Sequence, residues 1–348
     1  MIPVSCRSMA ANPLPKAHPF SGEFQFALQA VQHAAQLTQQ VQAEMTGPAL
    51  TKSDRSPVTV ADFAAQALIG SLLAEAFPHD PLVAEEDAAA LRAPAGSPTL
   101  IQVTDFVRRF LPRITPRTVC DAIDRGTATP APRFWTLDPV DGTKGFLRGG
   151  QYAVALALIV DGQVQIGVLG CPSLSEACHP DSDGPGSLVA TVRGQGVWST
   201  PLNVNAEFTR LQASSRKDPA EARLLRSFEA DHTNTDQMDE AARALHIQAP
   251  PLAMDSQAKY AVLAAGAGDL LLRLLSPKQP DYREKIWDQA AGSLVVEEAG
   301  GRISDLDGHP LDFTVGRTLV RNRGVIASNG HLHAAALQAV RQVRQGYQ

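Results

Sequence analysis

The chain has 348 residues, of which 44% are apolar and 19% are charged, and its formal net charge is −5 at pH 7. This length suits two closely packed domains, and the apolar share is enough for a sizeable core. With 31 Lys and Arg against 36 Asp and Glu, the chain lacks the basic field of a general nucleic-acid binder. A small anionic ligand needs only a local positive patch and metal ions, so the charge balance allows it.

The four cysteines, Cys6, Cys120, Cys171 and Cys178, have no zinc-type spacing. So few thiols in so long a chain do not make a disulfide scaffold, and we expect a reducing, cytoplasmic compartment. No apolar run reaches the roughly 18 residues of a membrane span. Residues 1–20 contain no acidic side chain and are expected to be a disordered leader, with organellar import as the open alternative.

Apolar residues at helical spacing predict two helices in the first part of the chain, over residues 21–45 and 62–77. Thr59 and Asp62 form the [ST]-x-x-[DE] pattern that starts a helix. Residues 81–87, PLVAEED, are expected to form a short buried strand that ends in acidic side chains.

Residues 88–133 are the least regular part, because prolines and glycines mark loops around one short helix over 115–126. We expect a variable surface insertion there. The following part is β-rich, and Asp161-Gly162 is a strong hairpin turn. Strands are expected at residues 135–138, 152–160 and 163–170, with a further hairpin over 187–200.

After residue 205 helices and strands alternate. Residues 221–228 fit either a strand or a short helix. Helices are expected at 236–245, 256–265, 286–300 and 334–345, and strands at 269–275, 301–308 and 323–330. The pattern predicts an α/β chain of the α+β type, with an N-terminal domain over 21–205 and a C-terminal domain over 206–348.

The most informative stretch is WTLDPVDGTKGFLR, residues 135–148. Asp138 and Asp141 lie three positions apart at the end of a predicted strand. Pro139 has a fixed φ and no N–H, so we expect the chain to turn there and bring both carboxylates to one side. Together with the carbonyl of Val140 they would form an oxygen cage for hard cations.

Other polar groups reinforce this interpretation. Gly142 and Thr143 open a predicted helix, whose free N–H groups suit an anion. Glu85 ends a strand, Asp62 opens a helix, and Asp288 lies at a third helix start. Each has an ordinary structural explanation as a turn, a cap or a charge on a helix dipole. Their occurrence together favours a site for cations beside a phosphate ester.

With these residues in view, the chain resembles the inositol monophosphatase-like superfamily of metal-dependent, lithium-sensitive phosphatases. The segments AEED, LDPVDGTKGF and IWDQAAGSLVVEEAGG match its three metal-site motifs in order, and the likeness covers roughly residues 22–335. The resemblance implies a layered αβαβα sandwich of the sugar-phosphatase kind, with two closely packed domains.

Within the superfamily, the segments DGTKGFLRG, MDSQAKYAVLAAGAGDLLLRL and PLDFTVGRTL look like the 3′(2′),5′-bisphosphate nucleotidases. This likeness implies hydrolysis of the 3′-phosphate of adenosine 3′,5′-bisphosphate to AMP and phosphate. 3′-Phosphoadenosine 5′-phosphosulfate is the second substrate that it implies. The expected partner is a small phosphorylated nucleotide, with no nucleic acid and no membrane, and the expected state is a monomer or weak homodimer.

Carried over by position, the resemblance implies two or three Mg²⁺ ions. Asp62 and Thr143 would orient and deprotonate the attacking water. The implied metal ligands are Glu85, Asp138, the carbonyl of Val140, Asp141 and Asp288. The implied substrate-binding residues are Gly142, Thr143, His232, Ser256, Lys259 and Arg273. Ser256 and Lys259 are expected to share one helix face. The resemblance also implies that the C-terminal domain selects the substrate.

Two alternatives stay open. The first is an inositol phosphatase that acts on inositol monophosphate or on the 1-phosphate of inositol 1,4-bisphosphate, and a substrate panel discriminates it. The second is a sensor of nucleotide and metal that has lost catalysis. The presence of both Asp62 and Thr143 argues against the sensor, because their substitution would be its signature.

Overall fold

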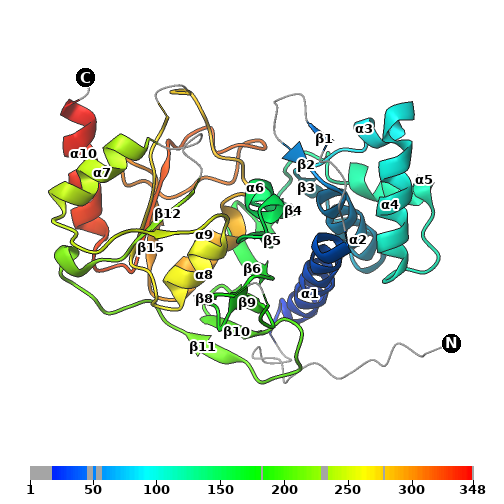
Figure 1. The fold of residues 1–348 in the computed structure, drawn as a ribbon, viewed down its shortest axis with the longest axis horizontal. Helices are drawn as coiled ribbons and strands as arrows, with labels where there is room; N and C mark the ends of the chain where they lie inside the picture. Colours follow the sequence, from blue (N-terminus) through cyan, green and yellow to red (C-terminus); the bar gives the residue numbers. More distant parts are fainter. Residues whose placement is uncertain are drawn as a thin grey trace.

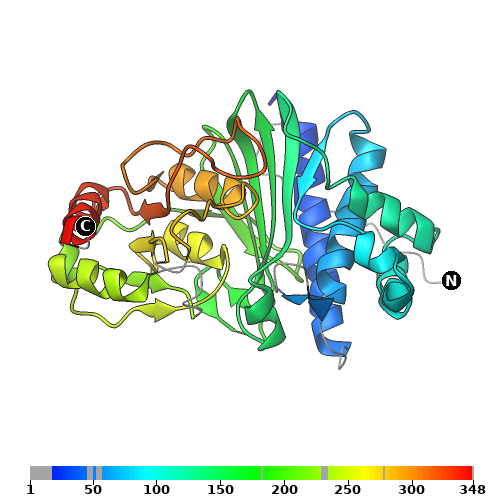
Figure 2. The same ribbon diagram turned by 90° about the horizontal axis from the view of Figure 1, so that it is seen from above.

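A computed structural model of the chain describes residues 18–44, 50–51, 57–181, 183–228, 234–276 and 279–346. In this described part the elements stack as helices, sheet, helices, sheet and helices (Figures 1 and 2). The layered αβαβα sandwich expected from the resemblance is therefore confirmed. Residues 1–17 of the expected leader lie outside the described residues.

The first helical layer consists of α1 (Ser21–Glu44) and α2 (Val60–Ala76), which pack against each other and against the first sheet. The start of α2 is a capping box, as predicted. The Thr59 side chain accepts from the backbone N–H of Ala61, and the Asp62 side chain accepts from the backbone N–H of Thr59. Asp62 is thus held at the first turn of a buried helix.

The expected irregular insertion is largely helical, so its irregular character was predicted wrongly, whereas the short helix expected over 115–126 is confirmed. It holds α3 (Ala89–Arg92), the 3₁₀ turn η1 (Pro94–Gly96), α4 (Ser97–Arg108) and α5 (Pro116–Asp124). Pro98 lies at the start of α4, where a missing N–H costs nothing. A proline taken as a loop marker instead begins a helix, and the apolar side of α4 packs on α2.

Within the described residues, the first sheet has seven strands in the order β11-β10-β9-β6-β5-β4-β3. Neighbours pair antiparallel except β3 with β4, which is parallel. The predicted turn between β5 and β6 has positive φ at both Asp161 and Gly162, 49° and 76°. The bounds are β3 (Leu82–Ala84), β4 (Arg133–Asp141), β5 (Ala153–Val160), β6 (Gln163–Cys171), β9 (Ser187–Val192), β10 (Val197–Pro201) and β11 (Thr209–Leu211).

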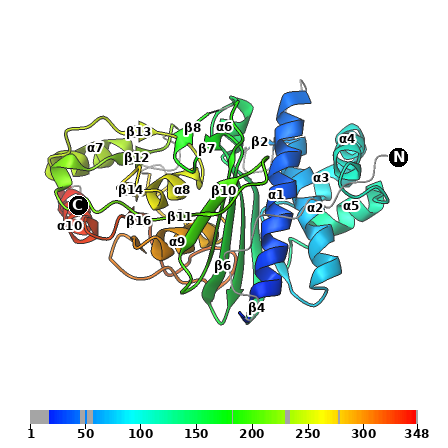
Figure 3. The same cartoon turned by 90° about the horizontal axis from the view of Figure 1, so that it is seen from below.

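This sheet is buried on both faces, which explains its long apolar strands. Along β5, Leu156 and Leu158 join the core beneath α1 and α2, whereas Ala155 and Ala157 face α8 (Ala258–Ala264) and α9 (Ala290–Glu298). These last two helices lie on the opposite face of the sheet from α1 (Figure 3). The small side chains on that face allow the second half of the chain to approach closely.

Within the described part, the second sheet has five strands in the order β13-β12-β14-β16-β15. Helices α8 and α9 cover one side of it, and α7 (Thr235–Ala244) and α10 (His333–Gly346) cover the other. Residues 221–228, left open between strand and helix, contain a strand. The bounds are β12 (Leu224–Arg226), β13 (Leu252–Ala253), β14 (Leu270–Arg273), β15 (Arg302–Ser304) and β16 (Val325–Ser328), and the small pieces are β1 (Leu50–Thr51), β2 (Pro57–Val58), β7 (Leu174–Ser175), β8 (His179–Pro180) and η2 (Pro219–Glu221).

Strand β11 still belongs to the first sheet, and the second sheet begins with β12. The proposed division between the two halves at residue 205 therefore falls just before the last strand of the first sheet, and it stays a prediction. Cys120, Cys171 and Cys178 are free thiols. No helix in the described ranges has both the length and the apolar character needed to cross a bilayer.

Candidate active site

The two aspartates of the DPVD segment lie on one face of the first sheet because strand β4 contains a β-bulge. Asp138 pairs with Ala155 and Asp141 with Ala153, so three steps along β4 correspond to two steps along β5. In a regular strand, residues three apart point to opposite faces. The extra residue restores them to the same face. The expected turn at Pro139 was wrong, because the strand continues through it to Asp141.

Directly after β4 the chain enters the short helix α6 (Thr143–Leu147) through Gly142, as predicted. Gly142 has a φ of 87°, and a Cβ there would lie only 3.0 Å from the Cβ of Ser256. Glycine thus serves two needs, a left-handed backbone and a close approach of the second half of the chain. This contact brings Ser256 next to the end of β4.

Thr143 connects the start of α6 to the start of α2. Its hydroxyl lies 3.2 Å from Oδ1 of Asp62 and 3.2 Å from the carbonyl oxygen of Val140. The other oxygen of Asp62 accepts from the hydroxyl of Thr59 at 2.6 Å and from its backbone N–H at 2.7 Å. Asp62 is fully buried. Its hydrogen bonds to Thr59 hold one carboxylate oxygen, and the other oxygen is oriented toward Thr143. The structure brings together the two residues expected to activate water.

The acidic side chains from the three motifs act on one another electrostatically. The pKa of Asp138 is raised well above its ordinary value, mainly by burial and then by the charges of Glu85, Asp141, Asp288 and Asp62. The pKa of Asp288 is likewise raised well above its ordinary value, mainly by burial. Five carboxylates from four separate segments of the chain thus lie close enough to act on one another.

The donor set suits a hard cation. It consists of carboxylates and the Val140 carbonyl, all oxygen ligands of the kind that Mg²⁺ prefers. Asp62 and Asp138 are buried, whereas Glu85, Asp141 and Asp288 are half-buried, so the cluster meets solvent on one side. Over the described ranges, no three acidic, His or Cys side chains converge tightly enough to ligate one ion. The residues nevertheless fit a hard cation in the type of their donor atoms.

Cationic side chains from the second half flank this cluster. The positive charges of Lys259 and Arg273 act against the raised pKa of Asp141, which results mainly from burial. Lys259 is buried, and its ammonium group donates to the hydroxyl of Ser227 at 3.0 Å and the carbonyl of Met254 at 3.2 Å. Burial lowers the pKa of Lys259 to about 8. Both cations thus act on the carboxylate at the end of β4.

One prediction about the substrate-binding residues was wrong, and another concerns a residue outside the described ranges. Ser256 and Lys259 do not share a helix face, because α8 begins at Ala258 and Ser256 precedes it with a φ of 66°. The left-handed backbone at Ser256 places it against Gly142 instead. His232 lies outside the described residues.

Gln257 is a residue of the site that the sequence did not single out. Its backbone N–H donates to Oδ2 of Asp141 at 2.6 Å. Its side-chain amide donates to the carbonyl of Trp287 at 3.0 Å and accepts from the N–H of Gly292 at 3.0 Å. Gln257 therefore joins the end of β4 to the segment that carries Asp288.

A second missed network fixes Arg273. Its guanidinium lies 2.8 Å from Oε2 of Glu284, a buried carboxylate, and the same oxygen accepts from the amide of Gln289 at 3.0 Å. Gln289 in turn accepts from the hydroxyl of Tyr260. The sequence signal for Glu284 was weak, because an acidic residue in a loop is normally solvated. These bonds hold Arg273 in one orientation.

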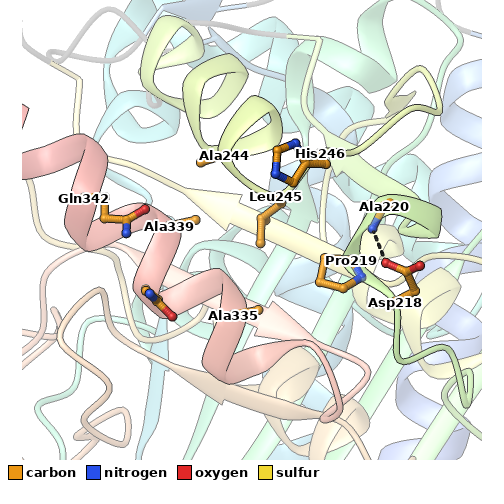
Figure 4. A pocket seen from close by; sticks show the side chains of 10 residues that line it. Asp218, Pro219, Ala220, Ala244, Leu245, His246, Ala335, Ala339 and Gln342 are labelled. Carbon is orange, nitrogen blue, oxygen red and sulfur yellow. Dashed lines mark hydrogen bonds between the residues drawn. The ribbon is translucent and has the colours of Figure 1, made fainter.

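A pocket of about 330 Å³ lies elsewhere, on the outer side of the second sheet. It lies between α10, the end of α7 and the 3₁₀ turn η2, with Leu245, His246 and Ala339 among its lining residues (Figure 4). The acidic cluster is on the inner side of that sheet. The pocket therefore takes no part in the site.

The model of the inositol monophosphatase family matches residues 22–345, which is most of the chain. The chain belongs to the inositol monophosphatase family. This is a family of phosphoric monoester hydrolases, so the protein is an enzyme of that class.

Relatives of this family member are named 3′(2′),5′-bisphosphate nucleotidase. One from Schizosaccharomyces pombe is 40% identical over 343 residues, covering 93% of this chain and 96% of the relative. One from Emericella nidulans is 41% identical over 341 residues, covering 90% and 96%. A third, named 3′(2′),5′-bisphosphate nucleotidase 1 and from Arabidopsis thaliana, is 40% identical over 342 residues, covering 92% of this chain and 96% of the relative.

Solved structures confirm the inositol monophosphatase fold. An IMPase from Thermotoga maritima matches with a TM-score of 0.64 at 19% identity, over 94% of this chain and 99% of that one. CysQ from Bacteroides thetaiotaomicron, described as a bacterial member of the inositol monophosphatase family, matches with a TM-score of 0.60 at 19% identity, over 90% and 98%. At these identities the likeness concerns the fold alone.

Proposed function

We propose that the protein is a Mg²⁺-dependent 3′(2′),5′-bisphosphate nucleotidase that removes the 3′-phosphate of adenosine 3′,5′-bisphosphate. The observation that carries the proposal is the cluster of Asp138, Asp141 and Asp288 beside two cations, Lys259 and Arg273. Acids suit metal ions, and cations suit a second anionic group on the substrate. Relatives 37–41% identical over nine-tenths of the chain bear this enzyme's name.

Two or three Mg²⁺ ions would be held by Glu85, Asp138, the Val140 carbonyl, Asp141 and Asp288. The chemistry that bound Mg²⁺ supplies is neutralisation of the ester dianion and a lowered pKa for a coordinated water. We also propose that Li⁺ inhibits this hydrolysis.

The protein's own groups supply the proton transfer. Thr143 positions the attacking water through its hydroxyl, and Asp62 takes the proton, because a hydroxyl alone is too weak a base. The buried bonds from Thr59 keep Asp62 oriented for this step. Backbone N–H groups of Gly142 and Thr143 face the non-bridging phosphate oxygens at the start of α6.

Substrate selection is assigned to the second half of the chain. Lys259 and Arg273 would bind the 5′-phosphate, together with Ser256. The 5′-phosphosulfate of 3′-phosphoadenosine 5′-phosphosulfate presents a similar anion, so we propose it as the second substrate.

The test is phosphate release from adenosine 3′,5′-bisphosphate, with inositol 1-phosphate and inositol 1,4-bisphosphate in parallel, each with and without Mg²⁺ and with added Li⁺. We expect Mg²⁺-dependent, Li⁺-inhibited release from the nucleotide, leaving AMP. A preference for an inositol phosphate would keep the metal chemistry and overturn the roles of Lys259 and Arg273. No release from any substrate would favour a non-catalytic sensor.

A further inference from the structure

Arg317 lies in the segment between β15 and β16 and reaches across to the first half of the chain. Its guanidinium donates to the carbonyl oxygens of Ala84, of Gly126 at 2.9 Å and of Ala128 at 3.1 Å. The backbone N–H of Ala84 also bonds the carbonyl of Gly126, at 2.8 Å. The Arg317 side chain thus links the end of β3 to residues 126–128, which lie beside it. Ala84 immediately precedes Glu85.

The same residue contacts the segment that leads to Asp288. The backbone carbonyl of Arg317 accepts from the N–H of Ile286 at 3.2 Å, and Thr318 forms a β-bridge with Lys285. The guanidinium carbon lies 4.9 Å from the ring centre of Trp287, over its face. Trp287 immediately precedes Asp288. Arg317 therefore contacts the residue before each of two acids that come from different halves of the chain.

We propose that Arg317 is a positioning residue that sets the spacing of Glu85 and Asp288 for divalent-cation binding. The proposal rests on the metal site of the proposed function. Arginine suits the task because its rigid fork offers five N–H donors, and three carbonyls and an aromatic face engage it at once. A lysine in its place carries the same charge but has a compact, flexible head that does not span the three carbonyls together.

The direction of the change in Mg²⁺ affinity on substitution of Arg317 distinguishes a positioning role from a purely electrostatic one. A positive charge near a cation site repels the ion. If Arg317 acted only through its charge, then removal of that charge would strengthen Mg²⁺ binding. If it holds the ligands at the correct spacing, then removal weakens binding. Changes to groups that orient metal ligands typically cost 10- to 100-fold in metal affinity.

The experiment is calorimetric titration of the substrate-free protein with Mg²⁺, on wild type, Arg317→Met and Arg317→Lys. We expect at least 10-fold weaker Mg²⁺ binding in both variants. Arg323→Met is the matched control, because Arg323 also donates to a loop carbonyl, that of Pro280 at 2.9 Å, without contacting the acidic cluster. Its Mg²⁺ affinity should equal that of the wild type. Circular dichroism of each metal-free variant verifies the fold.

Unchanged or tighter Mg²⁺ binding in a folded Arg317→Lys or Arg317→Met protein would overturn the proposal. If the Met variant does not fold, the Lys variant carries the test alone, because it keeps the charge and most of the packing. Wild-type protein that binds Mg²⁺ but does not release phosphate would contradict the proposed function and leave the role of Arg317 testable. Wild-type protein that does not bind Mg²⁺ would overturn both.

Discussion

Thr143 and Asp62 are the residues whose contacts bear most directly on chemistry. The Thr143 hydroxyl is shared between a buried carboxylate and a backbone carbonyl, each 3.2 Å away. Because Asp62 is already fixed by Thr59, the pair is preorganised without any substrate. Preorganised groups accept a proton without the cost of reorganising at the moment of reaction.

We expect Thr143→Val to lower kcat by about 10²- to 10⁴-fold, because it removes the hydroxyl and keeps the shape of the side chain. KM for the nucleotide should change little, and Thr143→Ser should recover most of the rate. Thr104→Val is the control, since Thr104 also bonds a carbonyl, that of Leu100 at 2.7 Å, but in α4. Full activity of the Val variant at position 143 would remove Thr143 from the mechanism.

The acids could be found from the sequence because they stand in short, ordered motifs. Gln257 and Arg317 could not be found, because their partners are remote in the chain, 116 residues away for Gln257 and Asp141 and 233 for Arg317 and Ala84. The burial of Lys259 was also missed, since a lysine in an otherwise apolar helix is normally placed on the surface.

Among the elements, those with strong apolar periodicity were predicted well, and two with proline were not. Pro98 begins α4 rather than breaking a helix, and Pro139 is accommodated in a strand that bulges. Both errors have one cause. A proline shows that one backbone N–H donor is absent, but it does not show whether a helix start, a strand or a turn accommodates that absence. The packing of α4 on α2 and the pairing of β4 with β5 determined which structure formed.

At the C-terminal end, α10 is fixed to the second sheet by a buried histidine. The ring of His333 bonds the hydroxyls of Ser304 on β15, at 2.9 Å, and Ser328 on β16, at 3.1 Å. Burial first, and then the charge of Arg302, lowers the pKa of His333 to about 4. The folded protein therefore requires the neutral ring.

This pKa predicts acid sensitivity of the second half of the chain. An unfolded histidine takes up a proton near pH 6.5 and the folded one only near 4, so stability is complete above 6.5 and falls as the pH drops from 6.5 toward 4. The loss is at most about 3 kcal/mol. Urea titrations at pH 7 and pH 5 should show a smaller decrease for His333→Gln than for wild type. The control is His331→Gln, at an exposed residue just before α10, which should behave as wild type. Equal pH slopes in all three proteins would contradict the assignment.

On the scale of the whole molecule, the acidic cluster joins the two halves. Glu85, Asp138 and Asp141 come from the first sheet, and Asp288 precedes α9 beneath the second. Their mutual repulsion opposes the ionised state of Asp138 and Asp288 at this junction. The layered architecture was expected from the resemblance to the superfamily, whereas the alternation of helices and apolar strands by itself predicted only an α/β chain of the α+β type.

We expect Asp138→Asn to raise the melting temperature of the metal-free protein and to reduce its rise on addition of Mg²⁺. Because the folded-state pKa of Asp138 is raised, its ionised form opposes folding. Metal-free stability therefore falls as pH rises from the ordinary carboxyl range through the raised pKa. The Asn variant should lose this slope.

Differential scanning fluorimetry with and without Mg²⁺ measures both effects. Asp105→Asn, an exposed acid on α4, is the control and should leave both unchanged. A metal-free melting temperature that is lower in Asp138→Asn than in wild type would show that the carboxylate stabilises the fold and would contradict the electrostatic account.

The bulge in β4 also offers a rule for design. Two carboxylates can be placed side by side on a sheet at positions i and i+2 of a regular strand, or at i and i+3 across a bulge. In the second arrangement, two residues between the acids face the single residue Val154 of the neighbouring strand. The extra backbone unit lies outside the regular ladder, so its carbonyl becomes a third oxygen between the two acids. An engineer who places paired carboxylates on a β-sheet scaffold at i and i+3 should therefore copy the irregularity together with the side chains.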